Sequence, residues 1–178
     1  MDEWIKKHKS LKGDEAIAEL TERYFTSHGP ATIQDFCWWC GLTQAEAKRG
    51  LEMVKEILVE EKIKGQSFWI KATTPAKIKT PGMYFLPPFD EYLVAYKDRS
   101  AALENLHSKK VFTINGIFSP VVIINGKIAA IWKRTITKKE VIIELQAFQK
   151  FTPAQKEGLK KAVKKYSRFI DLEVKLLF

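Results

Sequence analysis

The clearest local signal in the chain is Val121-Val122-Ile123-Ile124-Asn125-Gly126-Lys127-Ile128-Ala129-Ala130-Ile131-Trp132. Asn125-Gly126 accepts the positive φ angles of a type I′ turn, and β-branched residues precede and follow it. The stretch therefore predicts a β-hairpin with a tight turn. Further along the chain, Val141–Leu145 predicts another strand, and Glu173–Phe178 could close the same sheet.

A helix is predicted between these last two strands. Thr152-Pro153-Ala154-Gln155 supplies a capping Thr, a Pro suited to the first helical position and a Gln that closes a capping box. The predicted apolar stripe is Leu159, Val163, Tyr166 and Ile170. The opposite side of this helix is basic, with Lys156, Lys160, Lys161, Lys164, Lys165 and Arg168.

A proline-rich stretch from Ala72 to Pro88 precedes this β-rich part of the chain. Prolines at this density interrupt regular structure, so the stretch is interpreted as a connector. The predicted organisation is a domain at residues 1–74 and a second domain at residues 75–178.

Two helices are predicted at the start of the first domain. The first runs from Asp14, as N-cap, to Ser27, because Ile17, Leu20 and Tyr24 repeat at helical spacing and His28-Gly29-Pro30 stops it. The second is short, from Ile33 to Cys40, with Thr32 as its cap and Gly41 at its end.

A third helix and a hairpin follow. Thr43-Gln44-Ala45-Glu46 has the capping-box pattern. The predicted buried face of this helix is Ala47, Leu51, Val54 and Leu58. The hairpin strands are predicted at Val59–Lys64 and Ser67–Lys71, with Gly65-Gln66 at the turn.

Three helices with a short second turn, followed by a hairpin, are typical of a winged helix-turn-helix. The predicted fold class is therefore α+β. It consists of an N-terminal winged helix-turn-helix and a β-hairpin-centred subdomain with a basic C-terminal helix.

The charge of the chain favours an anionic partner. The sequence has 30 Lys and Arg against 21 Asp and Glu, a net charge of +9. Nucleic acid is the first expectation and an anionic membrane surface the second. No stretch approaches the roughly 18 consecutive apolar residues of a membrane span, and the charged first residues do not resemble a secretory signal. We therefore expect a soluble cytoplasmic protein without a membrane partner.

The excess charge lies mainly in the C-terminal half. No Asp or Glu occurs from Asn105 to Lys139. The cations predicted to contact DNA phosphates here are Lys127, Lys133, Arg134, Lys160 and Lys164. The alternative for the lysine-rich helix is an ordinary solvated surface.

The first domain offers weaker candidates for DNA contact. Lys48 and Arg49 lie on its predicted recognition helix, but Glu46, Glu52 and Glu56 would repel phosphates. Lys62 and Lys64 of the predicted wing could touch the DNA backbone. The alternative is a winged helix that only packs against another domain.

Two further patterns were weighed for chemistry. Cys37-Trp38-Trp39-Cys40 could be a redox pair or half of a zinc site, but it lies inside a short helix and no second ligand pair is present. Buried cysteines beside one or both Trp are favoured, with no metal or cofactor. Asp90-Glu91 could activate water, cap a helix or pair with Lys97 and Arg99; a structural role is favoured.

Several blocks of this sequence resemble a bacterial winged-helix family that includes the AlkZ/YcaQ-type interstrand-crosslink DNA glycosylases. The blocks span about Asp14 to Val174, and the most specific is Leu86-Pro87-Pro88-Phe89-Asp90-Glu91-Tyr92-Leu93. The others are Tyr24-Phe25, His28-Gly29-Pro30-Ala31-Thr32, Asp35-Phe36, Trp38-Trp39-Cys40-Gly41-Leu42, Tyr96-Lys97-Asp98-Arg99-Ser100, Phe118-Ser119-Pro120-Val121-Val122, Asn125-Gly126-Lys127 and Trp132-Lys133-Arg134.

The resemblance implies the C-terminal half of a longer protein with tandem winged helices. The family's catalytic Gln-x-Gln or Gln-x-Asp motif lies in the other half, and neither Gln34-Asp35 nor Gln146-Ala147-Phe148-Gln149 has its spacing. The family's DNA-approaching hairpin is similar in position to Ser119–Ile136.

Three hypotheses follow from the sequence. The first is a module that binds double-stranded DNA, intact or damaged, beside an upstream catalytic domain or partner chain. The second is an active base-excision glycosylase whose catalytic residue is unidentified. The third is a protein-interaction module.

Overall fold

The computed structural model describes residues 10–73 and 82–178, and the chain forms two compact units. The first comprises residues 1–76 with Ala95–Lys97, and the second comprises residues 77–94 and 98–178. Helices and sheets occur together, which confirms the α+β class. The predicted domain boundary at residues 74/75 lies outside the described residues.

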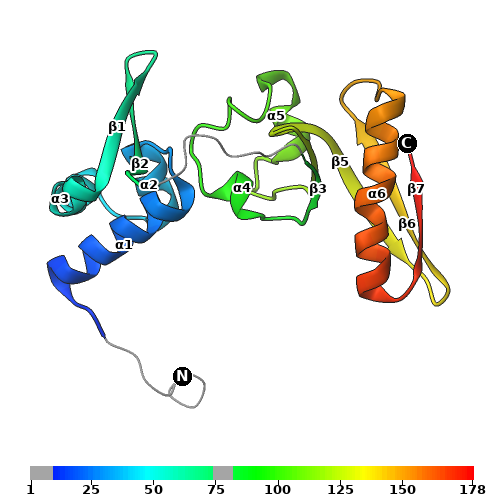
Figure 1. Cartoon of the computed structure of the whole chain (residues 1–178), viewed down its shortest axis with the longest axis horizontal. Helices are drawn as coiled ribbons and strands as arrows, with labels where there is room; N and C mark the ends of the chain where they lie inside the picture. The colour runs from blue at the N-terminus through cyan, green and yellow to red at the C-terminus, as the bar shows by residue number, and fades with distance from the viewer. Residues whose placement is uncertain (1–9, 74–81) are drawn as a thin grey trace. The chain divides into compact units, whose positions relative to one another are not determined.

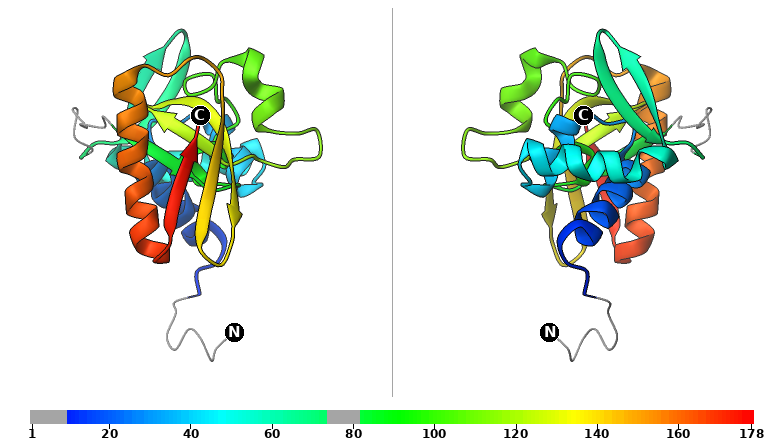
Figure 2. Two further views of the ribbon diagram at one scale, coloured as in Figure 1. Left: turned by 90° about the vertical axis from the view of Figure 1, so that its right-hand side faces the viewer. Right: turned by 90° about the vertical axis from the view of Figure 1, so that its left-hand side faces the viewer.

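The described part of the first unit begins with helices and ends in a hairpin (Figures 1 and 2). Its helices are α1 (Gly13–His28), α2 (Ile33–Cys40), α3 (Gln44–Val54) and the short 3₁₀ turn η1 (Lys55–Ile57). Its antiparallel strands are β1 (Leu58–Ile63) and β2 (Gln66–Lys71). These elements lie in the predicted order along the chain.

Side-chain caps start α2 and α3 as predicted. The hydroxyls of Thr32 and Thr43 accept hydrogen bonds from the N3 backbone N–H, and the N3 carboxylates accept from the cap N–H in return. Gly41, at φ +74°, ends α2 in the left-handed conformation that glycine adopts at little cost. The predicted N-cap of α1 is wrong, because α1 begins at Gly13 and Asp14 lies in its first turn.

The first hairpin differs from its prediction by one residue. Its turn is Lys64-Gly65, with φ of 52° and 78°, and Gln66 already belongs to β2. A type I′ turn needs positive φ at both of its central residues, and here these are Lys64 and Gly65. Gly65 is therefore the second residue of the turn, whereas the prediction made it the first. Leu58 was predicted on the buried face of the third helix. It is buried, but it lies at the start of β1, because α3 ends at Val54.

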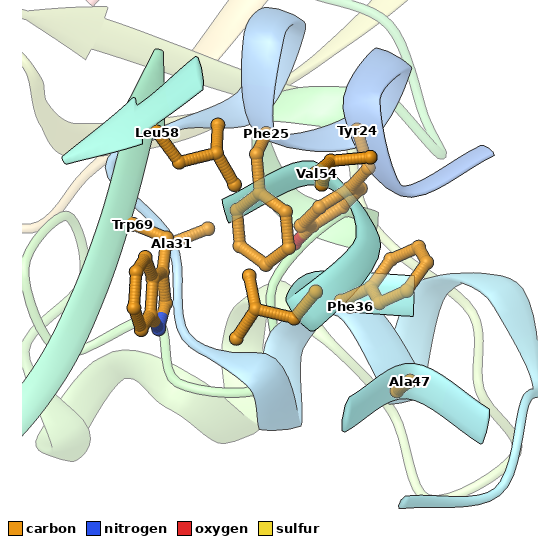
Figure 3. Close-up of a cluster of buried hydrophobic side chains, with 9 residues drawn as sticks. Tyr24, Phe25, Ala31, Phe36, Ala47, Val54, Leu58 and Trp69 are labelled. Atoms are coloured by element: carbon orange, nitrogen blue, oxygen red, sulfur yellow. The ribbon is translucent and has the colours of Figure 1, made fainter. Parts of the chain in front are cut away.

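The core of the first unit is built on aromatic side chains (Figure 3). Tyr24 and Phe25 of α1 and Phe36 of α2 are fully buried, and their rings lie within 6 Å of one another. Trp69 brings the hairpin to the same cluster. Gly50 lets α3 approach α1, since a Cβ there would lie 2.3 Å from Thr21 Oγ1.

A buried carboxylate connects α2 with a distant segment. Asp35 Oδ2 accepts hydrogen bonds from Thr32 N (3.0 Å) and Thr32 Oγ1 (2.7 Å). Its Oδ1 accepts from Lys97 N at 2.8 Å. The hydroxyls of Tyr24 and Tyr96 donate to the carbonyls of Ala95 and His28, both at 2.9 Å. These bonds make residues 95–97 part of the first unit.

In residues 82–178 the second unit has a five-stranded sheet of order β3-β4-β5-β6-β7. The strands are β3 (Met83–Leu86), β4 (Val121–Ile124), β5 (Lys127–Ile136), β6 (Glu140–Ala147) and β7 (Glu173–Leu177). Neighbours are antiparallel except β6 and β7, which are parallel and are connected by helix α6 (Pro153–Ile170).

The central hairpin confirms the type I′ prediction. Asn125 and Gly126 have φ of 51° and 78° between β4 and β5. Strand β5 continues to Ile136, beyond its predicted end at Trp132. Pairing with β6 extends it, and the last pair is Ile136 with Val141. The prediction that residues 72–88 form only a connector is wrong, since β3 occupies Met83–Leu86 and pairs with β4.

Different elements cover the two faces of this sheet. Leu159 and Val163 of α6 pack on one face, with Val122, Ala130 and Ile143. Side chains of the short helices α4 (Glu91–Val94) and α5 (Ser108–Val111) cover the other face. A 3₁₀ turn, η2 (Asn105–His107), immediately precedes α5. Helix α6 begins with the predicted box, in which Thr152 Oγ1 accepts from Gln155 N.

We predict that Asp35→Ala destabilises the chain by about 2–4 kcal/mol, because it removes a helix cap and leaves the buried N–H groups of Thr32 and Lys97 without this acceptor. The control is Glu46→Ala, which removes the N3 carboxylate of the exposed capping box of α3 and should cost about 1 kcal/mol. Urea unfolding followed by circular dichroism measures both. Equal losses would show that the buried bond to Lys97 contributes nothing.

Candidate nucleic-acid interface

Two neighbouring cations of β5 point to opposite faces of the sheet. Arg134 pairs with Ile143 of β6, which is buried against α6, whereas Lys133 pairs with Glu144. Side chains alternate along a strand, so these two charges cannot lie side by side on one face. Lys133 and Arg134 are therefore separate candidates for phosphate contact rather than one patch.

Arg134 is held against α6 by an aromatic side chain. Its Nη1 donates a hydrogen bond to the Tyr166 hydroxyl, and its guanidinium carbon lies 5.8 Å from the centre of that ring. Tyr166 was predicted only as part of the apolar stripe. Tyr166 also binds the Arg134 side chain, because β5 passes beside α6. The local sequence pattern does not reveal this proximity.

Lys133 and Lys127 have other partners. Lys133 Nζ forms an ion pair with Glu144 Oε2 at 3.2 Å, and most of the Lys133 side chain is exposed. Lys127 Nζ donates to the carbonyl of Ala101 at 2.5 Å. Part of the positive charge on the predicted hairpin is therefore engaged within the second unit itself.

Helix α6 presents its cations to solvent. The exposed ones are Lys156, Lys160, Lys161, Lys164, Lys165 and Arg168. Lys160 pairs with Glu157 at 2.8 Å, and this contact holds the pKa of the Glu157 carboxyl below its usual value. Lys160 and Lys164 also line a groove between α6 and β7 that contains Glu173. We call Arg134 together with these exposed α6 cations the α6 surface.

The candidates in the first unit are exposed but carry mixed charge. On α3, Lys48 is exposed, while Arg49 pairs with Asp14 of α1 at 3.1 Å. Lys62 lies on β1 opposite Ser67, and Lys64 occupies the tip of the hairpin. Acidic residues accompany these cations on both elements, with Glu46 and Glu52 on α3 and the exposed Glu60 and Glu61 on β1, so neither element is consistently basic.

The acidic pair considered for catalysis includes a helix cap. Asp90 Oδ1 accepts a hydrogen bond from Tyr92 N at 2.9 Å, and the Asp90 carbonyl accepts from the N–H of Leu93. The helix-capping alternative is therefore the one observed for Asp90. The Tyr92 hydroxyl donates to the Gly126 carbonyl at 2.7 Å, and burial raises its pKa.

Arg99 occupies an aromatic site rather than an open surface. Its guanidinium lies 5.4 Å from the Phe112 ring centre and 5.1 Å from that of Phe118. Its Nε donates to the Leu93 carbonyl at 2.6 Å. These contacts join residues that are distant in the sequence, so spacing alone predicts only the ion-pair role of Arg99 with the acidic pair.

The two cysteines are free thiols and only partly buried. Both cysteines and Trp39 pack against the core of the first unit, whereas Trp38 is 53% exposed. The predicted burial of the two cysteines is therefore only partial. Burial raises the pKa of both thiols, and Cys40 adds to this effect on Cys37. Among residues 10–73 and 82–178, no three His, Cys, Asp or Glu side chains cluster as metal ligands.

A hollow of about 490 Å³ lies in the second unit between the Asn125-Gly126 turn and the start of α6. His107 stacks on Phe148 at its wall, with ring centres 4.1 Å apart. Glu104 and Gln149 are also among its lining residues. The hollow therefore combines polar groups with an aromatic surface.

Comparison with known proteins identifies the family. Residues 1–169 match the family described as DNA glycosylase AlkZ-like. The chain belongs to this family. The suggested resemblance is thereby confirmed, and with it a relationship to DNA-repair glycosylases.

One relative is the interstrand DNA cross-link repair glycosylase of Streptomyces sahachiroi. It is 27% identical over 148 residues, which cover 76% of this chain and 38% of the relative. The solved structure of Streptomyces sahachiroi DNA glycosylase AlkZ has the same fold, with a TM-score of 0.77 and 22% identity over 96% of this chain and 48% of that one. This AlkZ-like chain thus spans less than half the length of the relatives it matches.

None of its described helices is long and apolar enough to cross a membrane.

We predict that Cys37 and Cys40 react more slowly with a thiol reagent near neutral pH than they do in the urea-unfolded chain. Their raised pKa values reduce the thiolate fraction, and only the thiolate is nucleophilic. The native rate should therefore keep rising at a pH where an ordinary cysteine has levelled off. Equal rates in both states would contradict the shift, and stoichiometric zinc in the purified protein would contradict the assignment as free thiols.

Proposed function

We propose that this chain is the DNA-binding part of an AlkZ-like glycosylase and that it binds double-stranded DNA mainly through phosphate contacts. The observation that carries the proposal is the exposed positive charge of the α6 surface. Lysine and arginine side chains on such a surface replace condensed counterions along DNA without reading its sequence. Damaged DNA is the expected biological substrate because of the family.

The first unit supports the proposal as a winged helix-turn-helix. Helices α2 and α3 are joined by the short turn at residues 41–43, and β1 and β2 take the place of the wing. In this proposal α3 approaches the DNA, and Lys62 and Lys64 of the wing contact its backbone. Lys48 and Arg49 contribute less, because Glu46 and Glu52 of the same helix repel phosphates.

The second unit supports it through the geometry of Arg134. A guanidinium held by Tyr166 has already lost much of its side-chain freedom, so little additional entropy is lost when it binds a phosphate. The α6 lysines Lys160 and Lys164 are exposed and flexible and supply general attraction. Lys133 belongs to the opposite face, next to Glu144, and Lys127 is tied to Ala101.

Family membership favours one alternative, an active base-excision glycosylase. The catalytic motif of the family pairs a Gln with a second Gln or an Asp, and the acidic residue next to Gln34 is Asp35. The carboxylate of Asp35 is buried, and it accepts hydrogen bonds from the backbone N–H groups of Thr32 and Lys97. Release of a free alkylated base from damaged duplex DNA by this chain alone would establish the enzymatic alternative. An absence of DNA binding would favour the third hypothesis, an interaction module.

The proposal is tested by titrating a labelled duplex across a salt series. We expect binding that is largely independent of sequence, with Kd of about 10⁻⁴–10⁻⁶ M at physiological salt, and affinity that falls steeply as salt rises. Unchanged affinity between low and moderate salt would contradict phosphate binding.

We predict that Arg134→Gln weakens DNA binding more than Lys133→Gln, although each substitution removes one positive charge. Arg134 shares the face of α6, whereas Lys133 lies on the other face and neutralises Glu144. Loss of one phosphate contact should lower the slope of log affinity against log salt by about 0.9 for Arg134→Gln. Thermal unfolding checks that both variants are folded. Equal losses of DNA affinity in the two variants would indicate that the interface acts only through diffuse electrostatic attraction.

A further inference from the structure

Strand β7 forms one edge of the five-stranded sheet. In the described part of the second unit, β6 is the one strand that pairs with β7, and the pairing is parallel. Figure 2 shows β7 (red) between β6 (yellow) and helix α6 (orange). Alternate backbone N–H and C=O groups of Glu173–Leu177 therefore point away from β6. Such a row of groups at a sheet edge is a template on which another extended segment can pair.

The groove between α6 and this edge has a volume of about 430 Å³. Lys160, Lys164 and Ser167 form its helical wall, and their spacing of four and three residues places them along one face of α6. The Ser167 hydroxyl donates a hydrogen bond to the Leu172 carbonyl at 2.6 Å, which joins α6 to the segment that leads into β7. Both lysines are exposed. The wall therefore has a fixed end at Ser167 and two accessible cations beyond it.

The rest of the groove offers apolar surface. Val174 and Leu176 of β7 line it together with the buried Val163 of α6. Because side chains alternate along a strand, Lys175 and Leu177 lie on the other face of β7. Lys175 Nζ pairs there with Glu140 at 2.5 Å, and Leu177 is 51% exposed. An extended segment beside β7 would thus meet cations on the α6 side and an exposed leucine on the other.

The charge along the groove is polarised. The chain reverses at Asp171, which has φ of +53°, so Glu173 lies near the Ser167 end and Lys160 lies toward the other end. Carboxylates of a ligand are therefore attracted beside Lys160 and Lys164 and repelled beside Glu173. A phosphate backbone can use the two cations, but it cannot pair with the N–H and C=O groups of a strand edge. A peptide can use both, and this favours an acidic peptide as the occupant.

We propose that the edge of β7 and its groove against α6 bind an extended acidic peptide segment as an added strand. Main-chain hydrogen bonds give such complexes affinity, and alternate side chains give them specificity. Side chains of the added strand that face α6 are acidic and contact Lys160 and Lys164, whereas those on the other face are apolar and pack beside Leu177. The proposal goes beyond DNA binding and does not depend on it. Because both lysines belong to the α6 surface, the bound peptide competes with any DNA held there.

The test uses a labelled peptide, Glu-Val-Glu-Val-Glu, blocked at both ends and as long as the five residues of β7. We expect fluorescence anisotropy to show binding, and hydrogen–deuterium exchange to slow in residues 173–177. Two further peptides carry backbone N-methyl groups on the Val or on the Glu residues. Alternate N–H groups of an added strand face its neighbour, so one N-methylated form should bind roughly tenfold more weakly and the other should bind normally.

The matched variants each remove two charges from α6. Lys160→Gln with Lys164→Gln should weaken peptide binding roughly fivefold, since each exposed ion pair contributes little. Lys161→Gln with Lys165→Gln removes charge from exposed positions outside the groove and should change the affinity by no more than about twofold, because distant exposed charges are screened. Thermal unfolding checks that both double variants are folded.

The outcomes separate strand addition from general electrostatic attraction and from the proposed function. Equal effects of the two N-methylated peptides, or equal losses from the two lysine pairs, would overturn strand addition. Duplex DNA binding without peptide binding would also overturn it and leave the proposed function standing. Peptide binding without DNA binding would do the reverse. Selective loss with one N-methylated peptide, together with slowed exchange in β7, supports the proposal.

Discussion

The carboxylate of Asp35 is the interaction on which the first unit depends. It is buried, and it holds two backbone N–H groups and a hydroxyl from residues as far apart as Thr32 and Lys97. A buried carboxylate is costly unless its oxygens are satisfied, so the start of α2 and the segment 95–97 must come together for either to be stable. The position of α2 in turn fixes the aromatic core formed by Tyr24, Phe25 and Phe36.

An internal partner does not exclude a cation from the proposed DNA interface. Several candidate cations are engaged internally: Arg49 with Asp14, Lys133 with Glu144 and Lys160 with Glu157. Exposed ion pairs of this kind are weak, so a phosphate competes with them readily. In the proposed interface, the contribution of a cation is therefore set less by its existing partner than by the face on which it lies.

Local chemistry made much of the fold predictable from the sequence. The caps at Thr32, Thr43 and Thr152 and the turn at Asn125-Gly126 depend on residues within a few positions of one another, and all four are present. Strand β3 was missed because it has only the residues Met83–Leu86 and is stabilised by pairing with the distant β4. The bonds of Asp35 to Lys97 and of Arg134 to Tyr166 likewise join distant residues, so spacing could not predict them.

The interleaving of the two units has a consequence for how such a protein can change over time. The chain leaves the first unit, supplies residues 77–94 to the second, returns for Ala95–Lys97 and then completes the second. A genetic exchange within the connector would separate Tyr24 and Asp35 from the backbone groups at Ala95 and Lys97 that satisfy them. The first unit is consequently poorly suited to transfer as an independent building block, and the two units are expected to be inherited together.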